Sequence, residues 1–490
     1  LILENNLYGL EIDERAGELA AFALAMKARG RHRRFFAKPV QPKICVLENI
    51  TFANEELKPY LDAVGQNLFT DKLRKTLNQF AECNNFGSLI KPEATDVSTL
   101  LRLLEDKKMA SNIFLHRTHE QVLRVLQYVD YLSPKYHVII ANPPYMGARG
   151  MNSRLVEWVK NNFPDSKSDT FAMFIARGFD LLLANGYNAM VTMESWMFLS
   201  SYEKFRDSLL RRATILTMVH MPYLGKGGTS MGINFGTAAT VFLNSHIHNA
   251  NGDFSCVRYY ETDDDGVPKE FPCQNERLSV ASASDFRKVP GSPIAYWLSD
   301  RFRAVFERAQ SLEEIADVKH GLSTGKNEAV VRLWTEVSTK DFKTDCSTRD
   351  EALDSGRKWF PYNKGGDYRK WYGNCEYVLR YDQYGNSLMA SFPGHRHDGK
   401  SHYFKEGVTW TFISSSNFAA RYTPNGFVFD VSGSSLFPTH PKRIVAFLCT
   451  ELCFNILKAL NPTLNFQVGN LKSLPIDVAA IDKVADRIDS

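Results

Sequence analysis

The sequence lacks the features that mark several common protein classes. No stretch is long and apolar enough to cross a bilayer, and Leu19 to Met26 is only the apolar part of a short helix. The eight cysteines are scattered, with no Cys-x-x-Cys pair and no matching histidines, which supports neither a zinc site nor a disulfide framework. We therefore predict reduced cysteines, a cytoplasmic location and no membrane partner.

The chain also lacks a strong excess of charge of either sign. Its 59 Lys and Arg residues nearly balance 55 Asp and Glu, giving a net charge of +4. A case for nucleic-acid binding must therefore rest on local clusters. Lys27 to Arg34 is one, and Lys364 to Lys370 followed by Trp371 and Tyr372 is another. Both put cations near aromatic rings, as phosphate and base contacts require. An ordinary solvated surface remains an alternative for the first cluster.

The most informative segment is Val-Ile-Ile-Ala-Asn-Pro-Pro-Tyr at 138–145, an apolar strand that ends in a rigid turn. Pro143 and Pro144 have fixed φ and no N–H to donate, so the turn leaves carbonyl oxygens free to accept hydrogen bonds. Asn142 adds a side-chain carbonyl, and Tyr145 adds a ring able to stack on a flipped base. The alternative is an ordinary strand-terminating turn.

These groups suit one reaction at an exocyclic amine such as N6 of adenine. That nitrogen is a poor nucleophile because its lone pair is delocalised into the ring. If the Asn142 side-chain oxygen and the Pro143 carbonyl each accept an N–H, the lone pair turns toward an electrophilic methyl group. S-adenosylmethionine is the natural donor once the two reactants are held in line. The pattern predicts methyl transfer to an amine without a strong general base.

Helices and strands are expected to alternate around this turn, as in a doubly wound α/β sheet. An acid at the carboxyl end of the first expected strand suits the ribose hydroxyls of a cofactor. The expected strands are Leu7 to Asp13, Lys43 to Leu47, Tyr187 to Thr192, Thr214 to His220 and Thr237 to Leu243. The expected helices are Glu14 to Ala28, Asp169 to Leu183 and Tyr202 to Leu210, with a turn at Asn185-Gly186.

The ordered motifs carry a resemblance to a known family. Leu-Glu-Ile-Asp at 10–13 is followed by Asn-Pro-Pro-Tyr-Met-Gly at 142–147, Lys-Ser-Asp-Thr-Phe-Ala-Met-Phe-Ile at 167–175 and Met-Val-Thr-Met-Glu-Ser-Trp-Met-Phe-Leu at 190–199. The chain resembles the N6-adenine DNA methyltransferases of the gamma motif order, most closely the PglX methyltransferases of bacterial BREX phage-defence systems. Segments 358–366 and 412–416 resemble that family too, so the similarity covers nearly the whole chain.

The resemblance implies a Rossmann-like S-adenosylmethionine-dependent methyltransferase sheet followed by an α+β target-recognition domain. It places Asn142, Pro143, Pro144 and Tyr145 in the catalytic motif. It also implies that double-stranded DNA is the substrate, that other BREX defence proteins are partners, and that the location is the bacterial cytoplasm.

The same resemblance assigns cofactor and target-base residues. Glu11 matches the acid that binds the cofactor ribose, and Ile12 the apolar residue beside its adenine. Glu48 stands where the family often has an acid near the adenine amine. Asp169 is expected at the cofactor pocket, with Phe171 in the same motif beside the target base. Phe235 is the candidate for a second aromatic face against that base, although Phe is more often a core residue.

One family feature is missing, the glycine-rich cofactor loop. The family places it some twenty residues or more before the Leu-Glu-Ile-Asp strand, but here only six residues precede Leu7. We therefore expect this chain to be a fragment that lacks that loop and the preceding region. Because only glycine lets the backbone approach the cofactor closely there, weak or absent cofactor binding is expected.

The predicted domain boundaries follow a change of composition. A polar stretch at 244–275 follows the last expected strand of the catalytic sheet, and from about residue 290 the sequence is rich in aromatics and short strands. We predict a catalytic domain at 1–245, a linker at 246–289 and a target-recognition domain at 290–490.

Several alternatives remain open. Gly321 to Asn327 is not a P-loop, because only three residues separate the glycines and Asn follows the Lys. The strongest alternative is a truncated or degenerate methyltransferase that binds DNA or partner proteins without catalysis. An N4-cytosine or RNA methyltransferase would use the same chemistry, although Asn at the first motif position favours adenine.

Overall fold

The structure of the protein is a computed structural model, and it describes residues 1–107, 113–223, 235–263, 269–270, 276–413, 417–461, 465–485 and 488. Residues 414–416 of the segment 412–416 noted above lie outside the described residues. The chain divides into two compact units. The first contains residues 1–192 and 240–246, and the second contains 193–239 and 247–490.

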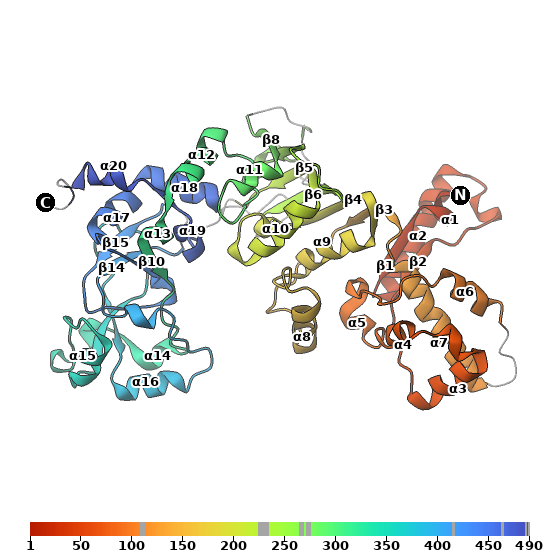
Figure 1. The fold of residues 1–490 in the computed structure, drawn as a ribbon, viewed down its shortest axis with the longest axis horizontal. Coiled ribbons are helices and arrows are strands. Elements are labelled where there is room, and N and C mark those ends of the chain that lie inside the picture. The colour runs from red at the N-terminus through yellow and green to blue at the C-terminus, as the bar shows by residue number, and fades with distance from the viewer. Residues whose placement is uncertain are drawn as a thin grey trace. The chain divides into compact units, whose positions relative to one another are not determined.

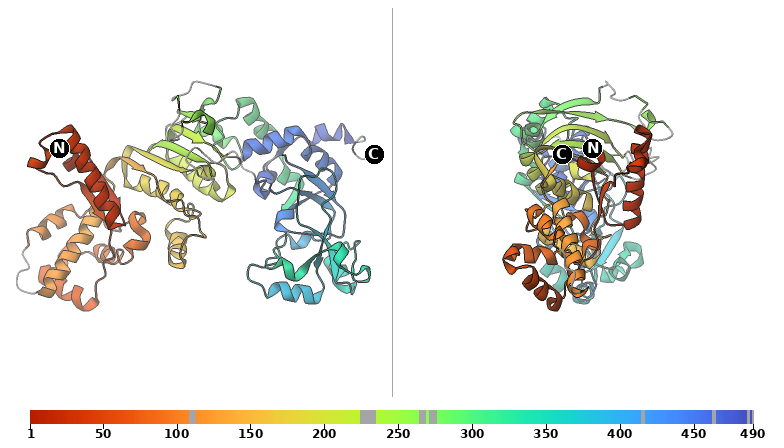
Figure 2. Two further views of the ribbon diagram at one scale, coloured as in Figure 1. Left: turned by 180° about the vertical axis from the view of Figure 1, so that it is seen from behind. Right: turned by 90° about the vertical axis from the view of Figure 1, so that its right-hand side faces the viewer.

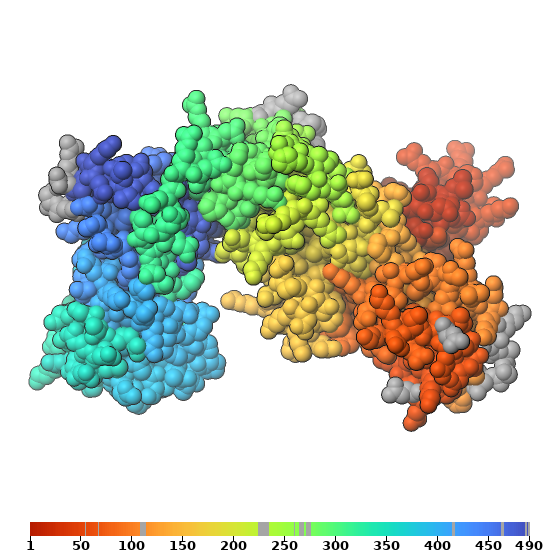
Figure 3. Space-filling model, viewed as in Figure 1, coloured from red at the N-terminus to blue at the C-terminus, as the bar shows by residue number. Residues whose placement is uncertain are grey.

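The first unit begins with the predicted strand, helix and strand. After the short helix α1 (Ile2–Asn5), β1 (Tyr8–Glu11) pairs in parallel with β2 (Lys43–Val46), and α2 (Glu14–Arg31) connects them. Asp13 caps α2 by accepting the N–H of Ala16 at 3.1 Å, which is why the helix starts directly after the strand. Helix α2 lies at the surface of the unit (Figure 3), and its apolar residues Leu19, Phe22 and Met26 are exposed.

A helical layer follows β2 and holds the core of the first unit. It is formed by α3 (Asn54–Val64), α4 (Asp71–Asn78), α6 (Ser98–Glu105) and α7 (Ile113–Tyr131), and α3, α4 and α6 all contact α7 (Figures 1 and 2). Between α4 and α6 lie α5 (Cys83–Phe86) and the 3-10 turn η3 (Gly87–Leu89). The fully buried Leu77, Phe80, Val122 and Leu126 belong to this core.

The second sheet of this unit carries the Asn-Pro-Pro-Tyr turn. Its strands follow the order β3 (Tyr136–Ala141), β4 (Leu182–Met193) and β6 (Thr237–Leu243), and β3 and β4 run parallel. Helices α8 (Ser153–Asn162) and α9 (Thr170–Leu181) connect β3 to β4. The start of β4 differs from the prediction, which placed a turn at Asn185-Gly186. Asn185 has a φ of +61° inside the strand, where main-chain hydrogen bonds join residues 185 and 186 to Asn244.

In the second unit, β5 (Thr214–Met221) pairs in parallel with β7 (Asn251–Cys256), which pairs antiparallel with β8 (Leu278–Ser282). The expectation that no further sheet strand follows residue 245 is therefore wrong. In the polar strand β7 only Gly252 and Phe254 are buried, and the apolar Leu278 and Val280 of β8 are exposed, so neither strand shows the pattern of a buried sheet strand. Helices α10 (Glu203–Arg212) and α11 (Ala283–Arg287) flank these strands in the sequence.

The remainder of the second unit is a mixture of short strands and helices. Two four-stranded sheets have the orders β10-β17-β14-β15 and β11-β13-β12-β16, and β9 pairs with β18. The strands are β9 (Gln310–Ser311), β10 (Ala316–Lys319), β11 (Val331–Leu333), β12 (Trp359–Asn363), β13 (Tyr377–Arg380), β14 (Gly407–Trp410), β15 (Ala420–Thr423), β16 (Val428–Phe429), β17 (Ser435–Pro438) and β18 (Pro475–Ile476). The helices are α12 (Asp300–Arg308), α13 (Leu312–Ile315), α14 (Asn327–Val330), α15 (Arg349–Asp354), α16 (Gln383–Ala390), α17 (Pro441–Leu448), α18 (Glu451–Leu460), α19 (Val468–Lys472) and α20 (Val478–Asp482).

The chain thus has the mixed α/β fold that its sequence predicts. The described part contains no helix with the length and apolar character of a membrane span.

Candidate active site

A cavity of about 450 Å³ in the first unit brings together the two motifs that the sequence singled out. Glu11 and Ile12 at the end of β1 line it, and so do Asn142, Pro143 and Pro144 after β3. Segment 85–89 and the first residues of α9 complete the wall. The ends of two strands more than a hundred residues apart in the chain therefore open into one space.

The Asn-Pro-Pro-Tyr turn is held in place by the first turn of α9. The Thr170 hydroxyl donates to the Pro144 carbonyl at 2.5 Å and accepts the N–H of Met146 at 3.1 Å. The carboxylate of Asp169, which caps α9, accepts the same Met146 N–H at 3.0 Å and the N–H of Phe171 at 3.3 Å. A helix N-terminus thus fixes the backbone directly after the two prolines.

The hydrogen bonds of this turn leave specific acceptors available. The Pro144 carbonyl is occupied by Thr170, whereas no described residue donates to the Pro143 carbonyl. The Asn142 side-chain oxygen lies 2.9 Å from the hydroxyl of Tyr145, which also lies 3.0 Å from the Val191 carbonyl. An amide oxygen has two lone pairs, so the Asn142 oxygen keeps one for a substrate N–H.

Burial gives Asp169 and Tyr145 different electrostatics from exposed side chains. Asp169 is only 7% exposed, and desolvation raises the pKa of its carboxyl although three residues donate hydrogen bonds that lower it. Burial also raises the pKa of the Tyr145 hydroxyl, so it stays a neutral donor at physiological pH. The Tyr145 hydroxyl is therefore a donor beside Asn142, and the Asp169 carboxylate is engaged by the N–H groups of Met146 and Phe171.

Glu11 has one oxygen fixed and one free. Its Oε1 accepts the N–H groups of Ile12 at 2.8 Å and Asp13 at 3.2 Å, which orients the carboxylate at the end of β1. No described residue contacts its second oxygen with a hydrogen bond or ion pair. A free, oriented carboxylate oxygen fits the two hydroxyls of a cofactor ribose.

Segment 85–89 contributes to the cavity, although no sequence pattern predicted a role for it. Asn85, Phe86, Gly87, Ser88 and Leu89 all line the wall. Gly87 has a φ of +51°, and a Cβ there would lie 2.9 Å from the Cγ2 of Ile12. Glycine is needed for both reasons. The only local signal was the glycine after Asn-Asn-Phe, which by itself is no more specific than any loop glycine.

Five predicted site residues lie outside this lining: Tyr145 and Asp169, described above, and three others. The Glu48 carboxylate binds Arg124 at 2.7 Å, so its cofactor role stays a prediction. Phe171 is fully buried, and its ring meets Tyr145 edge to face at 6.3 Å between centroids. Phe235 is half-buried in the second unit, and its role, like that of Phe171, also stays a prediction.

The two basic clusters differ in what they offer. Arg31 at the end of α2, with Arg33 and Arg34 after it, is exposed like them, and none of the three forms an ion pair with any described residue. Residues 364–373 form a loop whose rings are exposed, 56% for Trp371 and 57% for Tyr372. The first cluster therefore offers free charge, and the second offers aromatic surface.

The backbone of that aromatic loop is anchored. The Trp371 N–H donates to the Ala420 carbonyl at 3.0 Å, and the Trp371 carbonyl accepts the N–H of Tyr422 at 2.8 Å. The Lys370 ammonium donates to the Cys449 carbonyl at 2.8 Å. The loop is thus fixed to β15 and to Cys449 at the end of α17, while the Trp371 side chain is exposed.

Comparisons with known proteins show which proteins this chain resembles. The family described as Eco57I restriction-modification methylase matches residues 5–225. The adenine-specific methyltransferase BrxX of Escherichia coli O9:H4 (strain HS) is 36% identical over 97% of this chain and 41% of its own length. The adenine-specific methyltransferase PglX of Lacticaseibacillus casei (strain Zhang) is 32% identical over the same shares, 97% and 41%. Over nearly its whole length, the chain is similar to the adenine-specific methyltransferases BrxX and PglX.

These similarities confirm the resemblance seen in the motifs. The chain spans less than half the length of either relative, 41% in both cases. Among solved structures, the type IIL restriction-modification enzyme MmeI in complex with DNA aligns with 72% of this chain and 49% of its own at a TM-score of 0.46 and 9% identity.

Proposed function

We propose that this chain is the catalytic and recognition part of a site-specific DNA adenine N6-methyltransferase that uses S-adenosylmethionine and marks host DNA in a BREX-type phage-defence system. One observation carries the proposal. The Glu11 carboxylate and the Asn142-Pro143-Pro144 turn line the same cavity, so a cofactor ribose and a target amine would meet there. The names of both relatives, adenine-specific methyltransferases, support the choice of adenine.

The cavity suits the cofactor on the chemistry of its walls. The free oxygen of Glu11 would accept the ribose hydroxyls, and the side chains of Ile12, Leu47 and Phe174 line the same space as an apolar surface for its adenine. S-adenosylmethionine supplies an electrophilic methyl group. The role of the protein is to hold the target amine in line with it.

The turn would activate the adenine amine by accepting its two protons in hydrogen bonds. The free lone pair of Asn142 Oδ1 takes one N–H, and the unoccupied Pro143 carbonyl takes the other. Both acceptors are fixed before the base arrives, so little reorganisation accompanies the reaction. The base itself has to leave the duplex, at a cost of a few kcal/mol that stacking on Tyr145 offsets.

DNA contacts are proposed for both clusters. Arg31, Arg33 and Arg34 provide uncompensated charge for phosphates. Trp371 and Tyr372 provide exposed rings beside an anchored backbone, as single-stranded or distorted DNA requires. The region from residue 290 onward would then act as the target-recognition domain.

Methyl transfer to plasmid DNA tests the proposal. The product of the complete reading frame is compared with its Asn142→Ala variant and with Asn162→Ala, which removes an exposed asparagine at the end of α8 in the same unit. We expect N6-methyladenine from the wild type and the control, and none from Asn142→Ala.

Other products decide between the alternatives. Detection of N4-methylcytosine in place of N6-methyladenine would identify cytosine as the target base. No transfer by a product that still binds cofactor and DNA would favour the non-catalytic alternative, a protein that recognises DNA or a partner.

A base analogue tests the flipped base. 2-Aminopurine at the target position fluoresces when it is unstacked from the duplex. We expect Tyr145→Phe to keep most of the change that enzyme binding causes, because the ring remains, and Tyr145→Ala to lose it. Equal signals from both variants would remove the Tyr145 ring from base capture.

A further inference from the structure

A second cavity, of about 300 Å³, is built entirely from residues of the second unit. It lies where β5 and β7 end and β8 begins, and its lining includes His220, Arg258, Glu276, Tyr296 and Trp297. In open α/β sheets, ligands bind in crevices outside the carboxyl ends of the strands. The volume is at the lower end of the range for small-molecule sites.

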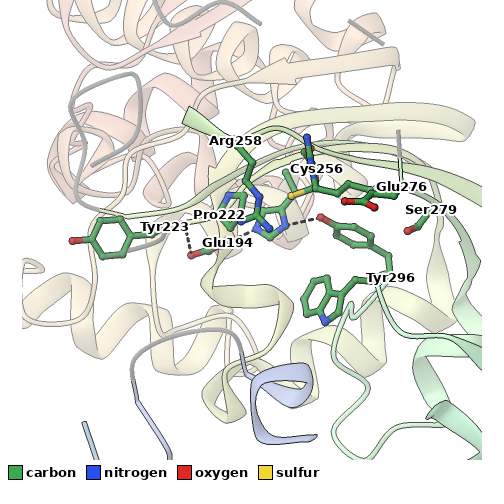
Figure 4. Close-up of a pocket in the computed structure, with 11 residues that line it drawn as sticks. Glu194, Pro222, Tyr223, Cys256, Arg258, Glu276, Ser279 and Tyr296 are labelled. Atoms are coloured by element: carbon green, nitrogen blue, oxygen red, sulfur yellow. Dashed lines mark hydrogen bonds and ion pairs between the residues drawn. The ribbon is translucent and has the colours of Figure 1, made fainter. Parts of the chain in front are cut away.

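The floor of this cavity is a rigid, buried chain of hydrogen bonds. The Glu194 carboxylate lies 2.7 Å from Nε2 of His220, and the Tyr296 hydroxyl lies 2.8 Å from Nδ1 (Figure 4). A carboxylate can only accept, so Nε2 of His220 donates to Glu194, and the Tyr296 hydroxyl engages the other ring nitrogen. The Tyr296 ring stacks on Phe254 at 5.0 Å, which fixes the floor further.

The rim carries groups without partners. The Arg258 guanidinium makes no ion pair and no hydrogen bond with any described residue. Arg277 beside it is different, because it is paired with Glu261. Glu276 is exposed and likewise unpaired among the described residues. Figure 4 shows Arg258 and Tyr296 directed into the same space, with Glu276 near Ser279 at its edge.

These charges restrict what the cavity can hold. A free anion such as phosphate would meet the carboxylates of Glu194 and Glu276, and a simple cation would meet Arg258. A neutral, planar ligand with acceptors on one edge and donors on another satisfies both sides. The half-buried indole of Trp297, which lies nearly parallel to the His220 ring, adds an aromatic wall for such a ligand.

We propose that this cavity binds a guanine base, either of a free nucleotide or of an unpaired nucleotide in DNA. A guanidinium offers only donors and matches the adjacent O6 and N7 acceptors of guanine, whereas adenine presents a donor beside N7. Glu276 would accept the exocyclic N2 amine of the same base. The proposal does not depend on methyl transfer, because no residue of the Asn-Pro-Pro-Tyr turn takes part.

Calorimetric titration of the chain with nucleosides tests the base. Guanosine is compared with adenosine, with 7-deazaguanosine, which lacks the N7 acceptor, and with inosine, which lacks the N2 amine. We expect guanosine to bind most tightly. Arg258→Gln should weaken the binding of guanosine by about five- to a hundredfold, the range for one bidentate pair. The affinity of Arg258→Lys should lie between those of the wild type and Arg258→Gln, because lysine keeps the charge but lacks the planar guanidinium.

The controls separate binding from folding. Arg211→Gln removes an exposed arginine of α10 that pairs with Asp207, and it should leave guanosine binding unchanged. Glu276→Ala should abolish the preference for guanosine over inosine while retaining the effect of N7. Thermal unfolding of each variant shows whether the second unit is intact.

DNA hairpins distinguish the two sources of the base. One hairpin carries a single bulged guanine, a second a bulged adenine, and a third is fully paired. Preference for the bulged guanine that Arg258→Gln removes, without binding of free guanosine, would assign the site to DNA. Equal binding of guanosine and adenosine, or guanine recognition that Arg258→Gln leaves intact, would overturn the proposal. So would the absence of any preference for guanosine and for the bulged guanine.

Discussion

Replacing Thr170 by valine tests whether α9 fixes the catalytic turn. Valine has nearly the same shape but no hydroxyl. The change removes the donor to the Pro144 carbonyl, 2.5 Å away, and one of the two acceptors of the Met146 N–H. Asp169 still accepts that N–H at 3.0 Å, so the turn is weakened at one of two attachments and the fold is retained.

The expected size follows from the bonds that are lost. One intramolecular hydrogen bond contributes about 0.5–1.5 kcal/mol, and Pro144 is exposed, so water partly replaces the donor. Local opening of the turn should become about two- to tenfold more frequent. If the turn then displaces Asn142 by even a fraction of an ångström, kcat should fall by up to about a hundredfold, with a smaller change in KM.

Amide hydrogen exchange over residues 142–150 measures the opening without any assumption about activity. Thr118→Val is the matched control, because Thr118 is a buried threonine of α7 whose hydroxyl donates to the Phe114 carbonyl at 3.1 Å. Thr170→Ser keeps the hydroxyl and should restore slow exchange. If Thr170→Val exchanges over 142–150 as slowly as Thr118→Val does, α9 does not fix the turn.

Four further outcomes are expected. Glu11→Gln should weaken S-adenosylmethionine binding about tenfold, as for loss of one charge-assisted hydrogen bond, measured by calorimetry. Asn142→Ala should abolish methyl transfer while DNA affinity in a mobility-shift assay stays within about twofold, since it removes one uncharged contact. Trp371→Ala should weaken DNA binding by roughly 1–3 kcal/mol with an unchanged salt slope, which a fall in slope would contradict. Because burial raises the pKa of Asp169 in the folded state, its stabilising contribution is present below the ordinary pKa and lost as pH rises through the raised value. Asp169→Asn should therefore gain stability relative to the wild type as pH rises toward neutrality, measured by denaturant unfolding at several pH values.

The sequence predicted those parts of the site that depend on neighbouring residues. The apolar run before Asn142, the acid at the end of the first strand and the helix that begins near Asp169 are local patterns, and each lies where it was expected. The ion pair between Glu48 and Arg124 joins residues 76 positions apart, and no local pattern indicates it. Whether an acid at a strand end faces a ligand or a cation is decided by such distant partners.

Segment 85–89 and the strands β7 and β8 show two other limits. The close approach of Ile12 to Gly87 is a contact between residues far apart in the sequence, so no local pattern indicates it. Strand β7 is polar, and β8 is short with its apolar Leu278 and Val280 exposed, so hydrophobic periodicity does not reveal them. Their pairing with β5 and with each other defines them. The second cavity lies at the ends of these strands, and a reading that treats 246–289 as a linker cannot find it.

The candidate sites share one construction, in which the surroundings fix a group while its functional atom stays free. Two hydrogen bonds hold one oxygen of Glu11 and leave the other open. The turn after β3 is anchored through Pro144 and Met146, while the Pro143 carbonyl is unoccupied among the described residues. Ordering such groups beforehand lowers the entropy lost when a ligand binds. Removing an anchor, as in Thr170→Val, should therefore slow the reaction without abolishing it, whereas removing the free atom, as in Asn142→Ala, should abolish it.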